Sequence, residues 1–100
     1  MTEENPGEAP AVGLRLLPWT TVDGRPCYLS TDGSGPVSAL ADSVEEIQLG
    51  MGEELLCHAR AMLADPKATE IEFRYLARCL VAALGDALRV ADCRAAAARR

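Results

Sequence analysis

The chain contains few aromatic residues and a single histidine, and this scarcity limits both its core and its chemistry. Only four of its 100 residues are Phe, Trp or Tyr, so we expect an aliphatic core built from Leu, Val, Ile, Met and Ala. No segment approaches the ~18 consecutive apolar residues that predict a membrane-spanning helix. The N-terminus is acidic and lacks the apolar segment of a secretory signal, so we expect a cytoplasmic protein.

The sequence also lacks the patterns typical of catalytic and metal sites. Its four cysteines have no Cys-x-x-Cys spacing and no paired histidines, so we expect no metal and no cofactor. No Gly-rich phosphate loop is present, and no nucleophile stands at a recognisable spacing from a base. We therefore expect no catalytic residue. The cysteines are best interpreted as buried free thiols that pack as small hydrophobic groups; they are Cys27, Cys57, Cys79 and Cys93.

The net charge of −5 is unevenly distributed along the chain. Acids dominate up to residue 65 and arginines dominate after it. This pattern predicts an acidic first helix that lies beside a basic second helix. Net acidity without an aromatic and basic surface argues against nucleic-acid binding.

The first third of the chain predicts a tail and a β-hairpin. Residues 1–13 are acidic and contain Pro and Gly, which is typical of a flexible tail. Residues 14–31 surround Asp23-Gly24, a signal for a two-residue type I′ turn. Such a turn would place Trp19 opposite Tyr28 as a cross-strand aromatic pair. A two-stranded hairpin is marginal alone in water, so it must pack on the helices or join another chain.

Two long helices follow the hairpin. Apolar residues recur at steps of three and four over residues 37–64 and 70–93, with a short corner around Pro66 between them. The short corner predicts antiparallel helices. Thr69 and Glu72 form a capping box for the second helix. Residues 94–100 have little to bury and are expected to fray as a basic tail.

The first helix carries two apolar rows. One row is continuous and consists of Val37, Leu40, Val44, Ile47, Met51, Leu55, His58 and Met62. The other consists of Leu49, Leu56 and Leu63 at seven-residue spacing. A surface this wide needs two neighbours. Possible capping boxes at Asp42/Glu45 and Ser43/Glu46 leave open a separate turn over residues 37–41 before the main helix.

One chain of this size cannot cover so much apolar helix surface. We therefore predict an α+β homodimer, in which an N-terminal β-hairpin precedes a long antiparallel helical hairpin and two chains form a four-helix bundle. The predicted interface residues are Val44, Ile47, Leu49, Met51, Leu56 and Leu63. Gly50 and Gly52 are either tolerated weak points or a place where helices cross closely in the dimer.

Two functional hypotheses follow from this organisation. The first is a non-enzymatic protein–protein interaction module, regulatory or accessory, which presents Trp19 and Tyr28 on its hairpin. The second is a small-ligand sensor with a pocket between hairpin and helices. Its lining residues would be Trp19, Cys27, Tyr28 and His58. The single histidine is otherwise expected to be buried in the core or interface, because no partner for catalysis is identifiable.

The composition and two segments also resemble a known group of proteins. Ala and Arg are abundant, whereas Lys, Asn and Gln are almost absent. With this composition, LRLLPWTTVDGRPCYLSTDG and ALADSVEEIQLGMGEELLCHARAMLADP are similar to small uncharacterised proteins of Streptomyces-type actinobacteria. The resemblance covers residues 13–93. It implies a cytoplasmic accessory protein of regulatory kind and assigns no functional residue.

Overall fold

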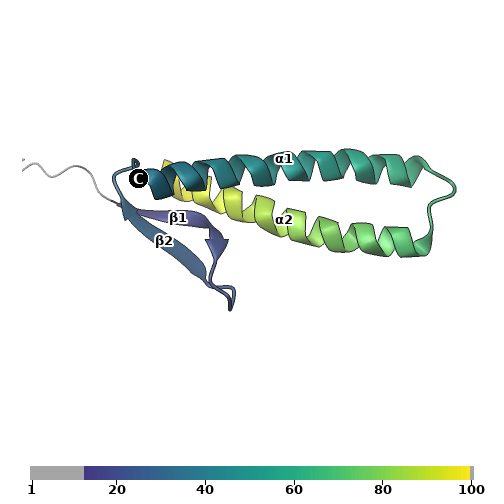
Figure 1. The fold of residues 1–100 in the computed structure, drawn as a ribbon, viewed down its shortest axis with the longest axis horizontal. Helices are drawn as coiled ribbons and strands as arrows, with labels where there is room; N and C mark the ends of the chain where they lie inside the picture. The colour runs from purple at the N-terminus through teal and green to yellow at the C-terminus, as the bar shows by residue number, and fades with distance from the viewer. Residues whose placement is uncertain (1–12, 100) are drawn as a thin grey trace, which may run out of the picture.

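The computed structural model describes residues 13–99, which form a β-hairpin followed by two long helices (Figure 1). Strands β1 (Gly13–Thr20) and β2 (Pro26–Thr31) pair antiparallel. Helices α1 (Pro36–Ala64) and α2 (Glu70–Ala98) lie side by side in opposite directions. The predicted α+β order of a hairpin followed by a helical hairpin is confirmed. Apart from Gly13, the predicted N-terminal tail lies outside the described residues.

The turn of the hairpin differs from the one predicted. The N–H of Gly24 donates to the carbonyl of Thr21, and the N–H of Thr21 donates to the carbonyl of Arg25, both at 2.9 Å. Gly24 has a φ of 86°, in the left-handed region that glycine adopts without strain. The strands are therefore joined by a wider loop with Gly24 at its left-handed position, and the predicted two-residue type I′ turn is wrong.

The register of the hairpin differs as a consequence. Leu16 pairs with Tyr28 and Thr20 pairs with the first residue of β2, with an irregularity between Leu16 and Thr20. The predicted pairing of Trp19 with Tyr28 is therefore wrong. Pro18 lies within the irregular segment and has no N–H to donate, so a regular ladder cannot pass through it.

Helix α1 is one continuous element that begins at a proline. Pro36 lies in the first turn, where its missing N–H costs nothing and its fixed φ suits the helix. Residues 37–41 therefore belong to the main helix and form no separate turn. Asp42 and Glu45 lie inside α1 and take part in ion pairs with Arg15, so they do not cap it.

Helix α2 begins as predicted and ends later than predicted. The N–H of Thr69 donates to the Glu72 carboxylate at 2.8 Å, and the N–H of Glu72 donates to the Thr69 hydroxyl at 3.2 Å, which confirms the capping box. The helix continues to Ala98, so residues 94–98 are not a tail. Alanine has the highest helix propensity, and Arg94 is held by an ion pair with Glu45.

The buried side chains are few and mostly small. They come from three elements, with Leu17 and Pro18 on β1, Ser38, Ala41, Glu45 and Ala59 on α1, and Leu76, Val90 and Cys93 on α2. Helix α1 thus turns small and polar residues towards α2 and leaves its large apolar residues to the sides. Strand β1 packs mainly on α2 and to a lesser extent on α1.

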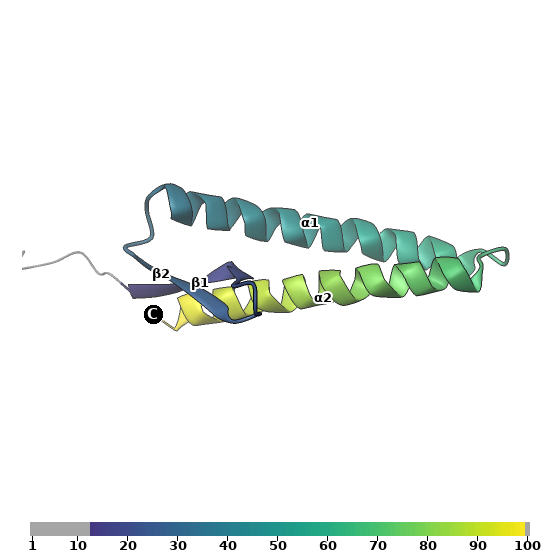
Figure 2. The same cartoon turned by 60° about the horizontal axis from the view of Figure 1, so that its bottom comes forward.

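The arrangement is elongated. The helical hairpin extends far beyond the β-hairpin, which lies beside the N-terminal end of α1 and the C-terminal end of α2 (Figure 2). The Cα radius of gyration is 18.8 Å, against about 13 Å for a compact domain of 100 residues. Among residues 13–99, no third element therefore covers the half of the helical hairpin near the Pro66 corner.

Candidate functional site

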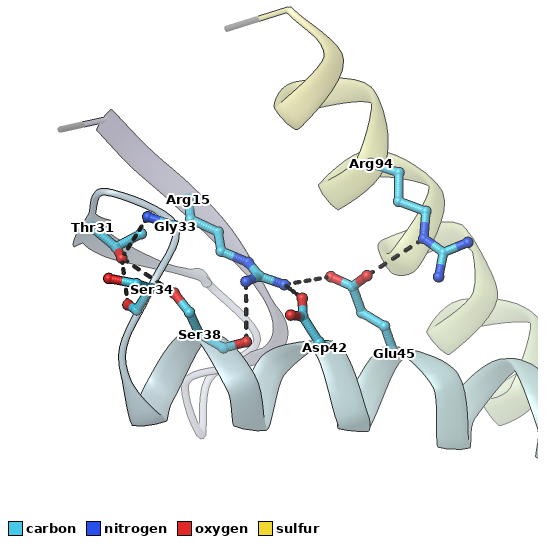
Figure 3. A network of polar contacts seen from close by, with 8 residues as sticks. All are labelled: Arg15, Thr31, Gly33, Ser34, Ser38, Asp42, Glu45 and Arg94. Atoms are coloured by element: carbon cyan, nitrogen blue, oxygen red, sulfur yellow. Dashed lines mark hydrogen bonds and ion pairs between the residues drawn. The ribbon is translucent and has the colours of Figure 1, made fainter. Parts of the chain in front are cut away.

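An ion network centred on the buried Glu45 side chain joins the β-hairpin to both helices (Figure 3). The Arg15 guanidinium on β1 donates to the carbonyl of Ser38 at 3.1 Å and contacts Asp42 at 2.6 Å and Glu45 at 3.3 Å. The other carboxylate oxygen of Glu45 accepts from Nε of Arg94 on α2 at 3.4 Å. Glu45 therefore connects residues that are far apart in the sequence.

The charges of this network compensate one another. The Glu45 side chain is only 8% exposed, but it lies between two guanidinium groups. Burial alone would lower the pKa of Arg15, yet its pKa is raised because Asp42 and Glu45 stabilise the charged form. A buried carboxylate without these partners would be costly. The network therefore fastens the hairpin in one position on the helices.

The open pocket beside this network is lined by both charged and small side chains. It has a volume of about 580 Å³ and is lined by residues of all the elements that meet there, including Arg15, Asp32, Glu45, Cys93 and Arg94. Burial, and secondarily the Glu45 charge, raises the pKa of the Cys93 thiol. A thiol with a raised pKa stays protonated at neutral pH and is poorly nucleophilic.

The cysteines and the two helices were also compared with the requirements of a metal site and of a membrane-spanning segment. Of the four cysteines, only Cys93 is buried, and Cys57 is exposed, so the expectation that all four are buried is wrong. Within residues 13–99, no group of three or more His, Cys, Asp or Glu side chains is placed to hold a metal ion. In the same residues, neither helix combines the length and apolar character needed to cross a bilayer.

The most extensive candidate site is an uncovered apolar surface on the helices. On α1, Ile47 is 59% exposed, Met51 is 61% exposed and Leu63 is 74% exposed. Leu56 is also exposed, whereas Val44 and Leu49 are half-buried. None of the six predicted interface residues is therefore fully buried within the part of the chain that the structure describes, and four of them are exposed. On α2, the exposed apolar side chains are Ile71, Tyr75, Val81, Leu84 and Leu88.

This apolar surface has two faces. One face contains an open groove of about 430 Å³, and the residues that line it are Gln48, Met51, Glu54, Leu55, His58, Cys79, Ala82, Ala83 and Asp86. Successive helical residues differ by about 100° in direction. Leu49, Leu56 and Leu63, which we call the leucine row, therefore lie on the other side of the α1–α2 contact. By the same geometry, Leu80 and Leu84 of α2 lie on that side too, and Leu88 continues this row to the pocket beside the β-hairpin.

The four residues of the predicted ligand pocket do not converge. His58 is exposed and lines the groove between the helices, far along α1 from the hairpin. Tyr28 lines a different pocket, between the hairpin and α2, together with Leu88 and Arg89. Trp19 and Cys27 are half-buried and line neither. The predicted burial of His58 in the core is also wrong.

Comparisons with models of protein families, with curated proteins and with solved structures give no match for this chain. Sequence reasoning missed the Arg15–Glu45–Arg94 network. No local pattern indicates it, because its residues come from β1, α1 and α2 and lie up to 79 positions apart in the sequence (Arg15 to Arg94).

Proposed function

We propose that this chain is a non-enzymatic protein–protein interaction module that works as a homodimer. The observation that supports it is the exposure of large apolar side chains along both helices. Monomers rarely expose apolar patches of more than a few hundred Å², and larger ones mark interaction sites. Two helical hairpins that pack by their apolar faces would form a four-helix bundle. As a regulatory or accessory protein of the cytoplasm, the dimer would present its β-hairpins to partners.

The experiment is a measurement of mass by sedimentation equilibrium over a wide concentration range. The wild-type chain is expected to be a dimer. The variant Leu56→Asp/Leu63→Asp places two charges in the interface and is expected to be a folded monomer, because both side chains are exposed within the chain.

The matched control is Val22→Asp, which changes an exposed apolar residue at the tip of the hairpin turn and is expected to leave the dimer intact. A wild-type chain that remains a stable monomer at high concentration would contradict the proposal.

The groove beside His58 favours a second candidate function, the binding of a small apolar molecule. Ligand pockets are concave and mostly apolar with a few polar groups, and Met51 and Leu55 line this groove beside His58. Saturable binding of a hydrophobic dye that Ala83→Phe abolishes, with the dimer retained, would support this function. Dye binding that Ala83→Phe leaves unchanged would exclude this groove as the site.

A further inference from the structure

Three charged residues of α1 and one of the corner that follows it form no ion pair within residues 13–99. Glu46, Glu53 and Arg60 each precede a member of the leucine row by three residues, and Lys67 continues the same spacing just past the helix. We call these four residues the charged row. All four are exposed, and none forms an ion pair within the described residues. Other surface arginines do pair, as Arg74 does with Glu70.

The order of charges in this row has a direction. Its N-terminal half is acidic and its C-terminal half is basic. Residues three apart on a helix are neighbours, so Glu46, Glu53 and Arg60 flank the leucine row on α1, and Lys67 follows in the corner between the helices. In packed helices, charges that flank an apolar seam select the partner and its orientation. The order of charges in this row therefore bears on whether a second copy packs parallel or antiparallel to the first.

An antiparallel contact between two α1 helices pairs every member of both rows favourably. With a two-fold axis at Leu56, Leu49 of one copy meets Leu63 of the other. Glu53 then lies beside Arg60 of the second copy, and Glu46 lies beside its Lys67. In a parallel two-fold contact the two charged rows would lie on opposite sides of the apolar seam, so Glu53 and Arg60 could not pair across it.

The apolar residues of α2 on the same face share this symmetry. Phe73 and Leu88 are equally distant from Leu80, to within one residue, and so are Ala77 and Leu84. The level of Leu80 along the helical hairpin is close to that of Leu56, because His58 and Cys79 line the same groove. One two-fold axis can therefore relate α1 to α1 and α2 to α2.

From these relationships we infer that two copies pack antiparallel through the face of the leucine row, with α1 against α1, α2 against α2, and the charged rows paired reciprocally. The inference rests on the proposed dimer and specifies its face, register and symmetry. It leaves the groove beside His58 open on the opposite face. The β-hairpins of the two copies would lie at opposite ends of the bundle.

Charge reversal tests the pairing. Glu53→Arg and Arg60→Glu each replace two attractive contacts by two repulsive ones, so each is expected to weaken dimerisation roughly tenfold or more. The double variant Glu53→Arg/Arg60→Glu restores opposite charges across the two-fold axis and is expected to recover wild-type dimerisation. A double variant that is as weak as the singles, or weaker, would overturn the inferred register.

Disulfide trapping tests the two-fold axis independently. In a Cys57→Ser background, Leu56→Cys is expected to cross-link two copies under mild oxidation, whereas Leu63→Cys alone is not. A mixture of Leu49→Cys and Leu63→Cys chains is expected to cross-link. Trapping of Leu63→Cys with itself would overturn the antiparallel arrangement but leave the dimer standing. A wild-type monomer would instead contradict the proposed function.

Discussion

Arg15 and Glu45 are 30 residues apart in the sequence, yet their side chains meet at 3.3 Å across the junction of β1 and α1. The Arg15 side chain is 14% exposed and the Glu45 side chain is 8% exposed, so both charges are largely removed from water. The second carboxylate oxygen of Glu45 is occupied by Arg94. Through Glu45, Arg15 on the hairpin is therefore linked to α2 as well as to α1.

The variant Glu45→Ala is expected to destabilise the chain by about 1–2 kcal/mol, because Arg15 and Arg94 each lose a charged hydrogen bond while Arg15 keeps its ion pair with Asp42. The expected result is a lower urea midpoint, measured by circular dichroism at a concentration where the oligomeric state is known. Part of the loss would come from the hairpin, which the network fastens.

The neighbouring Glu46→Ala is the matched control. Glu46 is exposed and forms no ion pair within residues 13–99, so its removal is expected to change the stability of a single chain by less than about 0.5 kcal/mol. Equal losses for the two variants would show that the buried network contributes nothing beyond an ordinary surface charge.

The difference in burial between Cys57 and Cys93 predicts that their thiols react with alkylating reagents at different rates. Cys57 is exposed, whereas Cys93 is buried and burial raises the pKa of its thiol. Iodoacetamide at neutral pH is expected to alkylate Cys57 first and Cys93 only after unfolding, as read by mass spectrometry of peptides. Denatured protein, in which both react, is the control. Rapid alkylation of Cys93 in the folded chain would contradict the packing between β1, α1 and α2.

The loop after β2 is expected to respond to acid. The side chain and the N–H of Ser34 donate to the Asp32 carboxylate at 2.6 and 3.0 Å, and these bonds lower the pKa of Asp32. A carboxyl group with a lowered folded pKa contributes stability above its unfolded pKa of about 3.9, and that contribution is lost as the pH falls through the folded value.

An acid titration followed by the Ser34 amide resonance is the measurement. The resonance is expected to shift with a midpoint below that of a free aspartate, and Asp32→Asn is expected to remove the transition. A midpoint at or above the unfolded value would show that Ser34 does not hold the carboxylate.

Local signals in the sequence were sufficient for the elements but not for their contacts. The Thr69–Glu72 capping box and the apolar spacing depend on residues within one or two turns, so they predict α2 and its start correctly. The register of the hairpin depends on how a ladder accommodates Pro18, and the ion network depends on residues from three elements. Neither can be derived from a local pattern.

The row of α1 that faces α2 was also not the one that apolar spacing favours. Large residues make the strongest periodic signal, but two helices approach most closely where their facing side chains are small. The inward row contains Ala41, Gly52 and Ala59, and the large residues Ile47 and Met51 lie to its side. The conspicuous stripe therefore stays exposed within residues 13–99. Spacing was sufficient to separate the leucine row from this stripe, but not to predict which side of the α1–α2 contact each row takes.

Gly50 and Gly52 in the middle of α1 are either tolerated weak points of the helix or the place where helices cross closely in the dimer, and substitution separates these two alternatives. A Cβ atom added to Gly50 or Gly52 would meet nothing within 4 Å, and neither residue belongs to the leucine row. Each substitution to Ala is therefore expected to stabilise the protein by about 0.5–1 kcal/mol, because alanine loses less backbone entropy in a helix. Thermal unfolding and sedimentation of the same samples check both quantities. If Gly50→Ala or Gly52→Ala instead dissociates the dimer, the helices must cross at these glycines, and the second copy packs on a face other than that of the leucine row.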